Sequence, residues 1–60
     1  MFEYICRNGK KVTINPKMIT AIFEGEQDGE CDIYTCDGID AIIVKANYEE
    51  VRDFWYRCLM

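Results

Sequence analysis

Residues 2–14, FEYICRNGKKVTI, contain two short runs rich in aromatic and branched side chains on either side of Asn8-Gly9. Both central positions of a two-residue type I′ turn need a positive φ, and Asn-Gly meets this requirement well. The pattern predicts a β-hairpin in which Ile5 lies opposite Val12. In this register both faces of the hairpin carry large apolar side chains, which is unusual for a sheet with one side in water.

A second hairpin is predicted further along the chain. Residues 31–36 and 39–45 flank Asp37-Gly38, which again favours a type I′ turn. This register places Ile33 opposite Ile42, and both faces are again largely apolar. The two hairpins therefore supply four strands.

The segment between the hairpins supplies a fifth strand. Asn15-Pro16 predicts a tight turn or one short helical turn, because Asn is a good N-cap and Pro suits the first helical position. Residues 19–24 then alternate as a strand. Residues 25–30 contain two Gly, three acids and no apolar residue, so we expect an exposed loop.

The C-terminal segment has the pattern of a helix. Asn47 is the expected N-cap, with Glu50 three residues later at the capping-box position. On the polar side of this helix, Asp53 can pair with Arg57 at i, i+4. The apolar side chains follow helical spacing on one stripe, which consists of Tyr48, Val51, Phe54, Trp55, Cys58 and Leu59.

The expected fold is therefore a single α+β domain spanning residues 1–60. It has a small antiparallel sheet or partial barrel of about five strands, built from two hairpins and a linking strand, with one C-terminal helix. Half of the residues are apolar, which excludes a disordered tail. No apolar run approaches a membrane span, and the start lacks the features of a signal peptide. We expect a cytoplasmic protein, in a bacterial cell or in the cytosol of a phage-infected host.

Self-association is expected from the same pattern. A chain of 60 residues buries only about 60% of the surface that its unfolded form exposes. One helix covers one face of the sheet, so the second apolar face requires either closure into a barrel or a neighbouring subunit. The candidate interface residues are aromatic, namely Phe2, Tyr34, Phe54, Trp55 and Tyr56.

The residue types argue against catalysis and metal binding. The chain has no His, which removes the usual base of a nucleophile pair and the commonest metal ligand. Its Cys residues stand at 6, 31, 36 and 58 without a close pair, and nothing indicates secretion. We therefore predict no catalytic residue, no metal, no cofactor and no disulfide framework, and we interpret the thiols as small core side chains.

Charge is distributed unevenly. The net charge is −4, which argues against binding a nucleic-acid polymer, yet residues 1–20 carry +3 and residues 21–60 carry −7. The basic group around the first turn is a candidate site for a small anionic ligand, formed by Tyr4, Arg7, Lys10 and Lys11. The alternative is that these cations solubilise and protect a hairpin end, and a head-to-tail contact between subunits is a third possibility.

Turn, strand and helix-start residues also carry a resemblance to a known family. They are Asn8-Gly9-Lys10, Val12-Thr13-Ile14-Asn15-Pro16, Ile19, Ile22, Asp37-Gly38, Lys45 and Tyr48-Glu49-Glu50-Val51. In this arrangement they resemble the small FlbD-like proteins found beside flagellar genes, over nearly the whole chain. The resemblance implies a non-enzymatic accessory or regulatory protein.

Two functions remain open from the sequence. The first is a homo-oligomeric regulatory or adaptor module that recognises another protein. The second is a phage-type sponge, since some compact β proteins of phages sequester nucleotide immune signals between their subunits. An enzyme is not expected.

Overall fold

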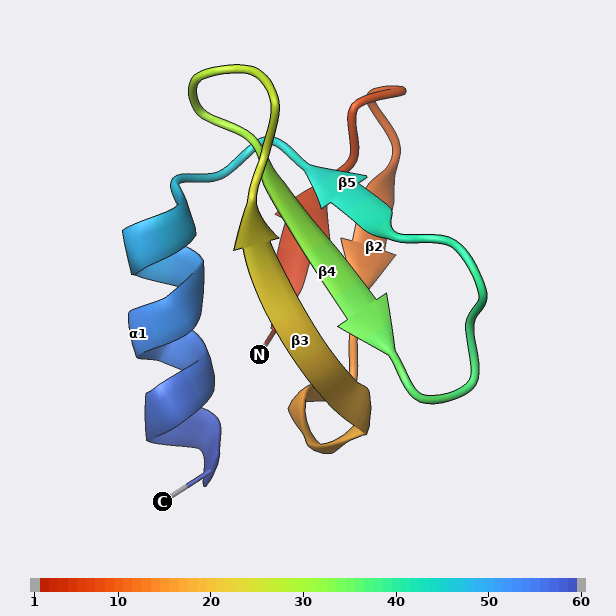
Figure 1. Cartoon of the computed structure of the whole chain (residues 1–60), viewed down its shortest axis with the longest axis vertical. Coiled ribbons are helices and arrows are strands. Elements are labelled where there is room, and N and C mark those ends of the chain that lie inside the picture. The colour runs from red at the N-terminus through yellow and green to blue at the C-terminus, as the bar shows by residue number, and fades with distance from the viewer. Residues whose placement is uncertain (1, 60) are drawn as a thin grey trace.

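The computed structural model describes residues 2–59 and contains, within them, five antiparallel strands and one C-terminal helix (Figure 1). This confirms the predicted α+β class. The elements are β1 Glu3–Ile5, β2 Lys11–Thr13, the 3-10 turn η1 Pro16–Met18, β3 Ile19–Glu24, β4 Cys31–Thr35, β5 Ile42–Val44 and α1 Tyr48–Leu59.

The strands form a hairpin, β1–β2, and a three-stranded meander, β3–β4–β5. A bridge between Cys6 and Val44 joins the two sheets. Two backbone bonds flank this bridge, from the Arg7 N–H to the Ile43 carbonyl at 2.9 Å and from the Lys45 N–H to the Ile5 carbonyl at 2.7 Å. Through this bridge the two sheets meet along β1 and β5 and form a curved sheet with the strand order β2-β1-β5-β4-β3, and α1 lies beside β3 (Figure 1).

The register of the first hairpin differs from the prediction by one residue. Ile5 lies opposite Lys11 rather than Val12. The cause is the turn, in which only Gly9 has a positive φ, of 88°. The Gly9 N–H donates to the Cys6 carbonyl at 2.8 Å, which closes a type I turn followed by one left-handed residue. This loop is one residue longer than the predicted type I′ turn.

The shift sorts the side chains of this hairpin cleanly between two faces, because a one-residue slip moves every side chain to the other side. Phe2 and Ile14 are buried, with 2% and 6% of their surface exposed, whereas Ile5 is 47% exposed. Half-buried Tyr4 and Val12 lie opposite one another on the inner side. The prediction that both faces of this hairpin are apolar is therefore wrong.

The second hairpin has the predicted register but a different turn. Ile33 lies opposite Ile42, as expected. The prediction of a type I′ turn at Asp37-Gly38 is wrong, because Gly38 does not adopt a positive φ. The strands end early and leave an open loop over residues 36–41 (Figure 1).

Strand β3 spans the predicted residues but carries a bulge. The register shifts between Ile19 and Ala21, so Thr20 is an extra residue opposite β4. The bulge lets Ile19 and Ile22 both contact the core, while Phe23 is exposed.

Helix α1 begins at the predicted cap. The Asn47 side-chain oxygen accepts the Glu49 N–H at 2.9 Å, and its carbonyl accepts the Val51 N–H at 3.1 Å. The predicted pair of Asp53 with Arg57 is wrong, because Asp53 instead contacts the neighbouring Arg52 at 3.2 Å.

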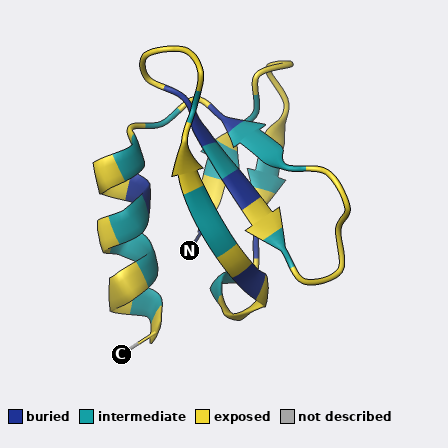
Figure 2. Cartoon of the chain, viewed as in Figure 1, coloured by how far each residue is buried: buried dark blue, intermediate teal, exposed yellow. Residues whose placement is uncertain are grey.

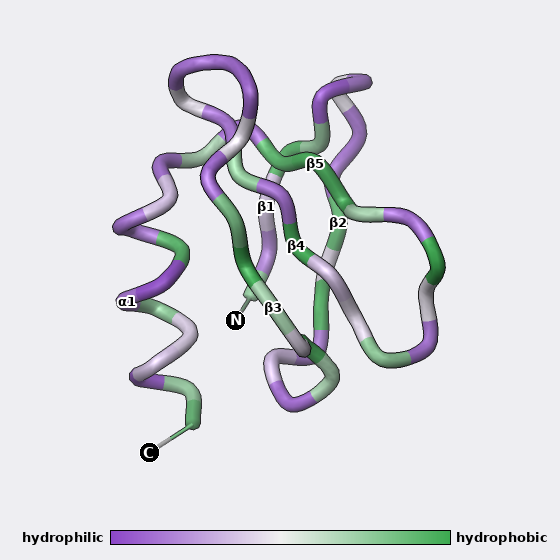
Figure 3. Tube along the Cα trace, viewed as in Figure 1, coloured by the Kyte–Doolittle hydropathy of each residue, from purple (hydrophilic) through white to green (hydrophobic). Residues whose placement is uncertain are grey.

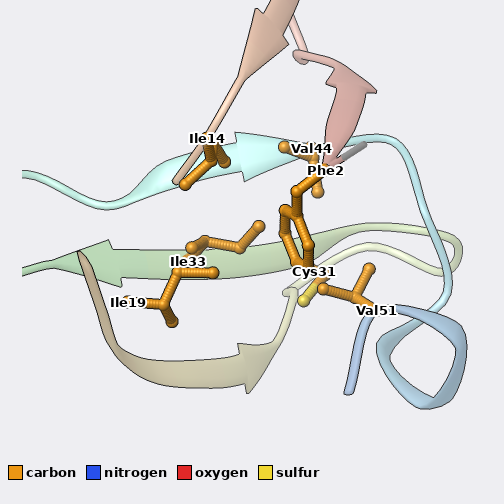
Figure 4. Packing of buried hydrophobic residues seen from close by; sticks show 7 residues of the cluster. All are labelled: Phe2, Ile14, Ile19, Cys31, Ile33, Val44 and Val51. Carbon is orange, nitrogen blue, oxygen red and sulfur yellow. The ribbon is translucent and has the colours of Figure 1, made fainter. Parts of the chain in front are cut away.

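The core lies between the curved sheet and α1 (Figure 2). Phe54 packs against Phe2 with ring centroids 5.4 Å apart, and the Trp55 indole N–H donates to the Pro16 carbonyl at 3.0 Å. These two contacts attach α1 to the residue before β1 and to η1. The buried apolar residues are Phe2, Ile14, Ile19, Cys31, Ile33, Val44 and Val51 (Figure 4).

The register makes a direct prediction about stability. Phe2→Ala removes a buried aromatic ring and should lower the free energy of unfolding by about 3 to 5 kcal/mol. Ile5→Ala trims a half-exposed side chain on the other face and should cost about 1 kcal/mol or less. Urea denaturation measures both.

A domain this small can lose its fold with Phe2→Ala, so Phe2→Leu provides a milder step that should still cost more than Ile5→Ala. If Ile5→Ala were the more damaging change, the observed register would be incorrect.

Candidate functional site

The four residues predicted to hold an anionic ligand are not brought together on one face. Tyr4 points inward, and burial raises the pKa of its phenol. Lys11 lies on the outer face opposite Ile5, and Lys10 is exposed at the end of the turn. Tyr4 and Lys11, which the predicted register placed on one face of the hairpin, thus lie on opposite faces.

Arg7 forms an ion pair within the chain. Its Nη2 lies 2.6 Å from Oε1 of Glu30 and its Nε lies 3.1 Å from Oε2, so the guanidinium donates to both carboxylate oxygens. The Glu30 side chain is only 8% exposed and that of Arg7 is 46% exposed. This contact joins the first hairpin turn to the start of β4, which lies 23 residues away in the sequence.

The ion pair shifts the pKa of both partners. The hydrogen bond from Arg7 holds the pKa of the Glu30 carboxyl below its ordinary value of 4.5, although burial acts in the opposite direction. The same bond raises the pKa of the Arg7 guanidinium. Arg7 is therefore paired with a carboxylate of its own chain.

Gly25 positions Glu30 for this contact. The Gly25 N–H donates to the Glu30 carbonyl at 3.0 Å and closes the loop between β3 and β4. A Cβ at residue 25 would lie 2.7 Å from the carbonyl carbon and oxygen of Glu30. Only glycine allows this close approach of the two backbones without a shift of the loop.

An open hollow lies beside Arg7, where β1 and its turn meet β5. It has a volume of about 520 Å³ and is lined mainly by apolar atoms. Sequence reasoning missed it, because its walls come from two segments that the chain brings together only through the β1–β5 contact. The lining residues are Cys6, Arg7, Asn8, Ala41, Ile42 and Ile43.

A second exposed feature is an aromatic pair on the outer face of the three-stranded sheet. The rings of Phe23 and Tyr34 meet edge to face, with centroids 5.5 Å apart and planes at 86°. Phe23 is 54% exposed and Tyr34 is 36% exposed. The sequence analysis named Tyr34 but missed Phe23, whose exposure follows from the bulge at Thr20.

The other candidate interface residues differ in their surroundings. Phe2 is buried in the core, and Phe54 and Trp55 are half-buried against the chain itself. Tyr56 is 53% exposed and stacks on Trp55 with centroids 6.1 Å apart. Tyr34 and Tyr56 are therefore the members of the predicted set that present a large surface.

The four thiols are all free. Cys31 is fully buried, and burial raises the pKa of its thiol to about 11. A thiol with such a pKa stays protonated at neutral pH and behaves as a small apolar side chain. Cys36 is exposed in the loop after β4, and its Sγ lies 3.8 Å from Sδ of Met18. Between residues 2 and 59, no three His, Cys, Asp or Glu side chains are grouped to hold a metal ion.

No protein-family model, curated protein or solved structure shows a significant match to this chain. The resemblance to FlbD-like proteins therefore stays a prediction. Within the described part of the chain, no helix has the length and apolar character that a membrane span requires.

The close approach at Gly25 predicts a cost for any side chain there. Gly25→Ala should lower the free energy of unfolding by about 1 to 3 kcal/mol, because the added Cβ overlaps the Glu30 carbonyl group. Asp28→Ala, an exposed change in the same loop, should stay within about 0.5 kcal/mol of wild type. Urea denaturation of the two variants measures the difference, and equal stabilities would contradict the close contact.

The ion pair predicts a pH-dependent stability. Because the pKa of Glu30 is lower in the folded chain, the pair stabilises the fold fully above the ordinary pKa of 4.5. That contribution is lost as the pH falls through the lower folded-state pKa. Glu30→Gln should therefore reduce stability at neutral pH, with a deficit that shrinks in acid.

Urea midpoints of wild type and Glu30→Gln between neutral pH and pH 3 follow this deficit. Glu26→Gln removes an exposed acid from the same loop without removing the bond to Arg7, and so serves as the control. A Glu30→Gln deficit that stayed constant with pH would contradict a stabilising ion pair.

Proposed function

We propose that this chain is a non-enzymatic, homo-oligomeric binding module that acts as a small regulatory or adaptor protein through protein–protein contacts. The observation that best supports this proposal is the Phe23–Tyr34 pair on the face of the sheet opposite the core. Exposed aromatic side chains held on paired strands lose little conformational freedom on binding, and aromatic residues dominate the energy of protein interfaces.

The proposed setting is the cytoplasm, of a bacterial cell or of a phage-infected host. An accessory role of the FlbD-like kind is compatible with this setting and with the small α+β fold.

The second candidate is a sponge that sequesters an anionic, nucleotide-like molecule between subunits. It is supported by the exposed Lys10 and Lys11 and by the hollow beside Arg7. Arg7 itself donates to Glu30, so an incoming anion would have to compete with a buried carboxylate for the guanidinium. This contact favours the adaptor over the sponge.

The adaptor proposal is tested with a partner protein that co-purifies with the wild-type chain from the cells that naturally produce this chain. Phe23→Ala and Tyr34→Ala should each weaken binding of the purified partner by about tenfold or more, which corresponds to about 1.4 kcal/mol. Leu59→Ala should leave the affinity unchanged, because Leu59 has a similar exposed fraction, 53%, but lies at the end of α1. Isothermal titration calorimetry measures the affinities.

Native mass spectrometry of the protein as purified from the same cells separates the two candidates. A retained small-molecule mass that disappears in the double variant Lys10→Ala, Lys11→Ala, together with no effect of Phe23→Ala on any partner, would overturn the adaptor proposal in favour of the sponge.

A further inference from the structure

The loop between β4 and β5 presents an apolar side chain to solvent. Ile39 is 95% exposed, the largest exposed fraction among the exposed apolar side chains of residues 2–59. Two acids, Asp37 and Asp40, flank it. Figure 3 shows a hydrophobic stretch within this otherwise hydrophilic loop. The loop thus combines an apolar tip with two negative charges.

The hollow beside Arg7 has the complementary character. It is open, lined mainly by apolar atoms, and large enough for a branched aliphatic side chain. Ala41, the last residue of the loop, forms part of its wall. Ile39 nevertheless does not fill the hollow of its own chain, because almost all of its surface is exposed.

The charges of the first hairpin are also complementary to those of the loop. Lys10 and Lys11 stand on the first hairpin, and no ion pair within residues 2–59 uses them or the two acids of the loop. In Figure 1 the hairpin turn and the loop both lie on the side of the molecule away from α1, the turn above β5 and the loop below it. This side therefore has a basic end, an apolar hollow and an acidic end with an apolar tip.

We infer that the hollow is occupied by Ile39 of a second copy of this chain, in a dimer with twofold symmetry. A half-turn about an axis through this side brings the basic hairpin turn of each copy to the acidic loop of the other. Each Ile39 then enters the hollow of the opposite copy, as the reciprocal contacts of a twofold interface require. A parallel placement would instead bring like charges together. The inference rests on the proposed function, since it supplies the surface for its homo-oligomer.

The first test changes the apolar tip. Ile39→Ala should raise the dimer dissociation constant by about tenfold or more, measured by sedimentation equilibrium, because it removes the apolar side chain that fills the hollow. Ile39 is exposed in the monomer, so the stability of the monomeric fold should not change. Leu59→Ala is the matched control at another exposed apolar position and should leave the dissociation constant unchanged.

The second test exchanges the charges. The double variant Lys10→Glu, Lys11→Glu places acid against acid in its own dimer, and Asp37→Lys, Asp40→Lys places base against base, so each alone should be largely monomeric. Mixed in equal amounts, the two variants should form a heterodimer, because both of its contacts are attractive. Native mass spectrometry distinguishes the heterodimer by mass.

The outcomes separate this inference from the proposed function. A wild-type chain that stays monomeric throughout the micromolar range would overturn both the dimer and the homo-oligomeric part of the proposed function. An oligomer whose dissociation constant is unchanged by Ile39→Ala and by both charge reversals would overturn the inference alone, because the subunits would then meet through another surface.

Discussion

The left-handed backbone at Gly9 is the constraint on which the arrangement of this small domain depends. With one left-handed residue, the first hairpin closes through a three-residue loop, and Tyr4 lies opposite Val12. This register sends Phe2 into the core, where it meets Phe54 of α1. A two-residue turn would place Tyr4 opposite Thr13 and replace this sorting by two mixed faces.

The sequence predicts the positions of the strands and the helix better than it predicts which residues pair. The pairing depends on the number of residues between the paired positions, and an error of one residue changes an odd number into an even one. In the second hairpin the predicted turn is wrong, but Ile33 still pairs with Ile42. Both strands end before the predicted turn, and the loop stays centred on the same residues, so the register is as predicted. In the first hairpin the loop has one residue more than Asn8-Gly9 indicates, so Ile5 pairs with Lys11 instead of Val12. The side chains of one strand then face the opposite way relative to those of the other. The bulge at Thr20 also adds one residue to one strand of a pair, and no local sequence pattern indicates it.

The candidate site is less predictable than the fold because its main contact is long-range. Nothing in the sequence near Arg7 identifies Glu30 as its partner; the β1–β5 bridge and the close approach of Gly25 to Glu30 create the contact. This pairing has a chemical consequence, because Arg7, which the sequence indicates as a ligand-binding cation, forms an ion pair with the nearly buried carboxylate of Glu30. The basic character of the hairpin turn then rests on the two lysines that follow Gly9.

The corrected register also changes the reason to expect self-association. The outer face of the first hairpin is largely polar, with Glu3, Lys11 and Thr13 beside Ile5, so a continuous apolar second face does not exist there. Exposed apolar side chains lie instead at several separate places, and two of these are the Phe23–Tyr34 pair and the loop that carries Ile39. In a chain of 60 residues with a single small core, neither feature contributes much to the monomer, because both lie outside the core cluster. The Phe23–Tyr34 pair and the loop that carries Ile39 belong to different elements, so a second copy of the chain and a partner protein need not compete for one surface. A homo-oligomeric adaptor requires two such separate surfaces.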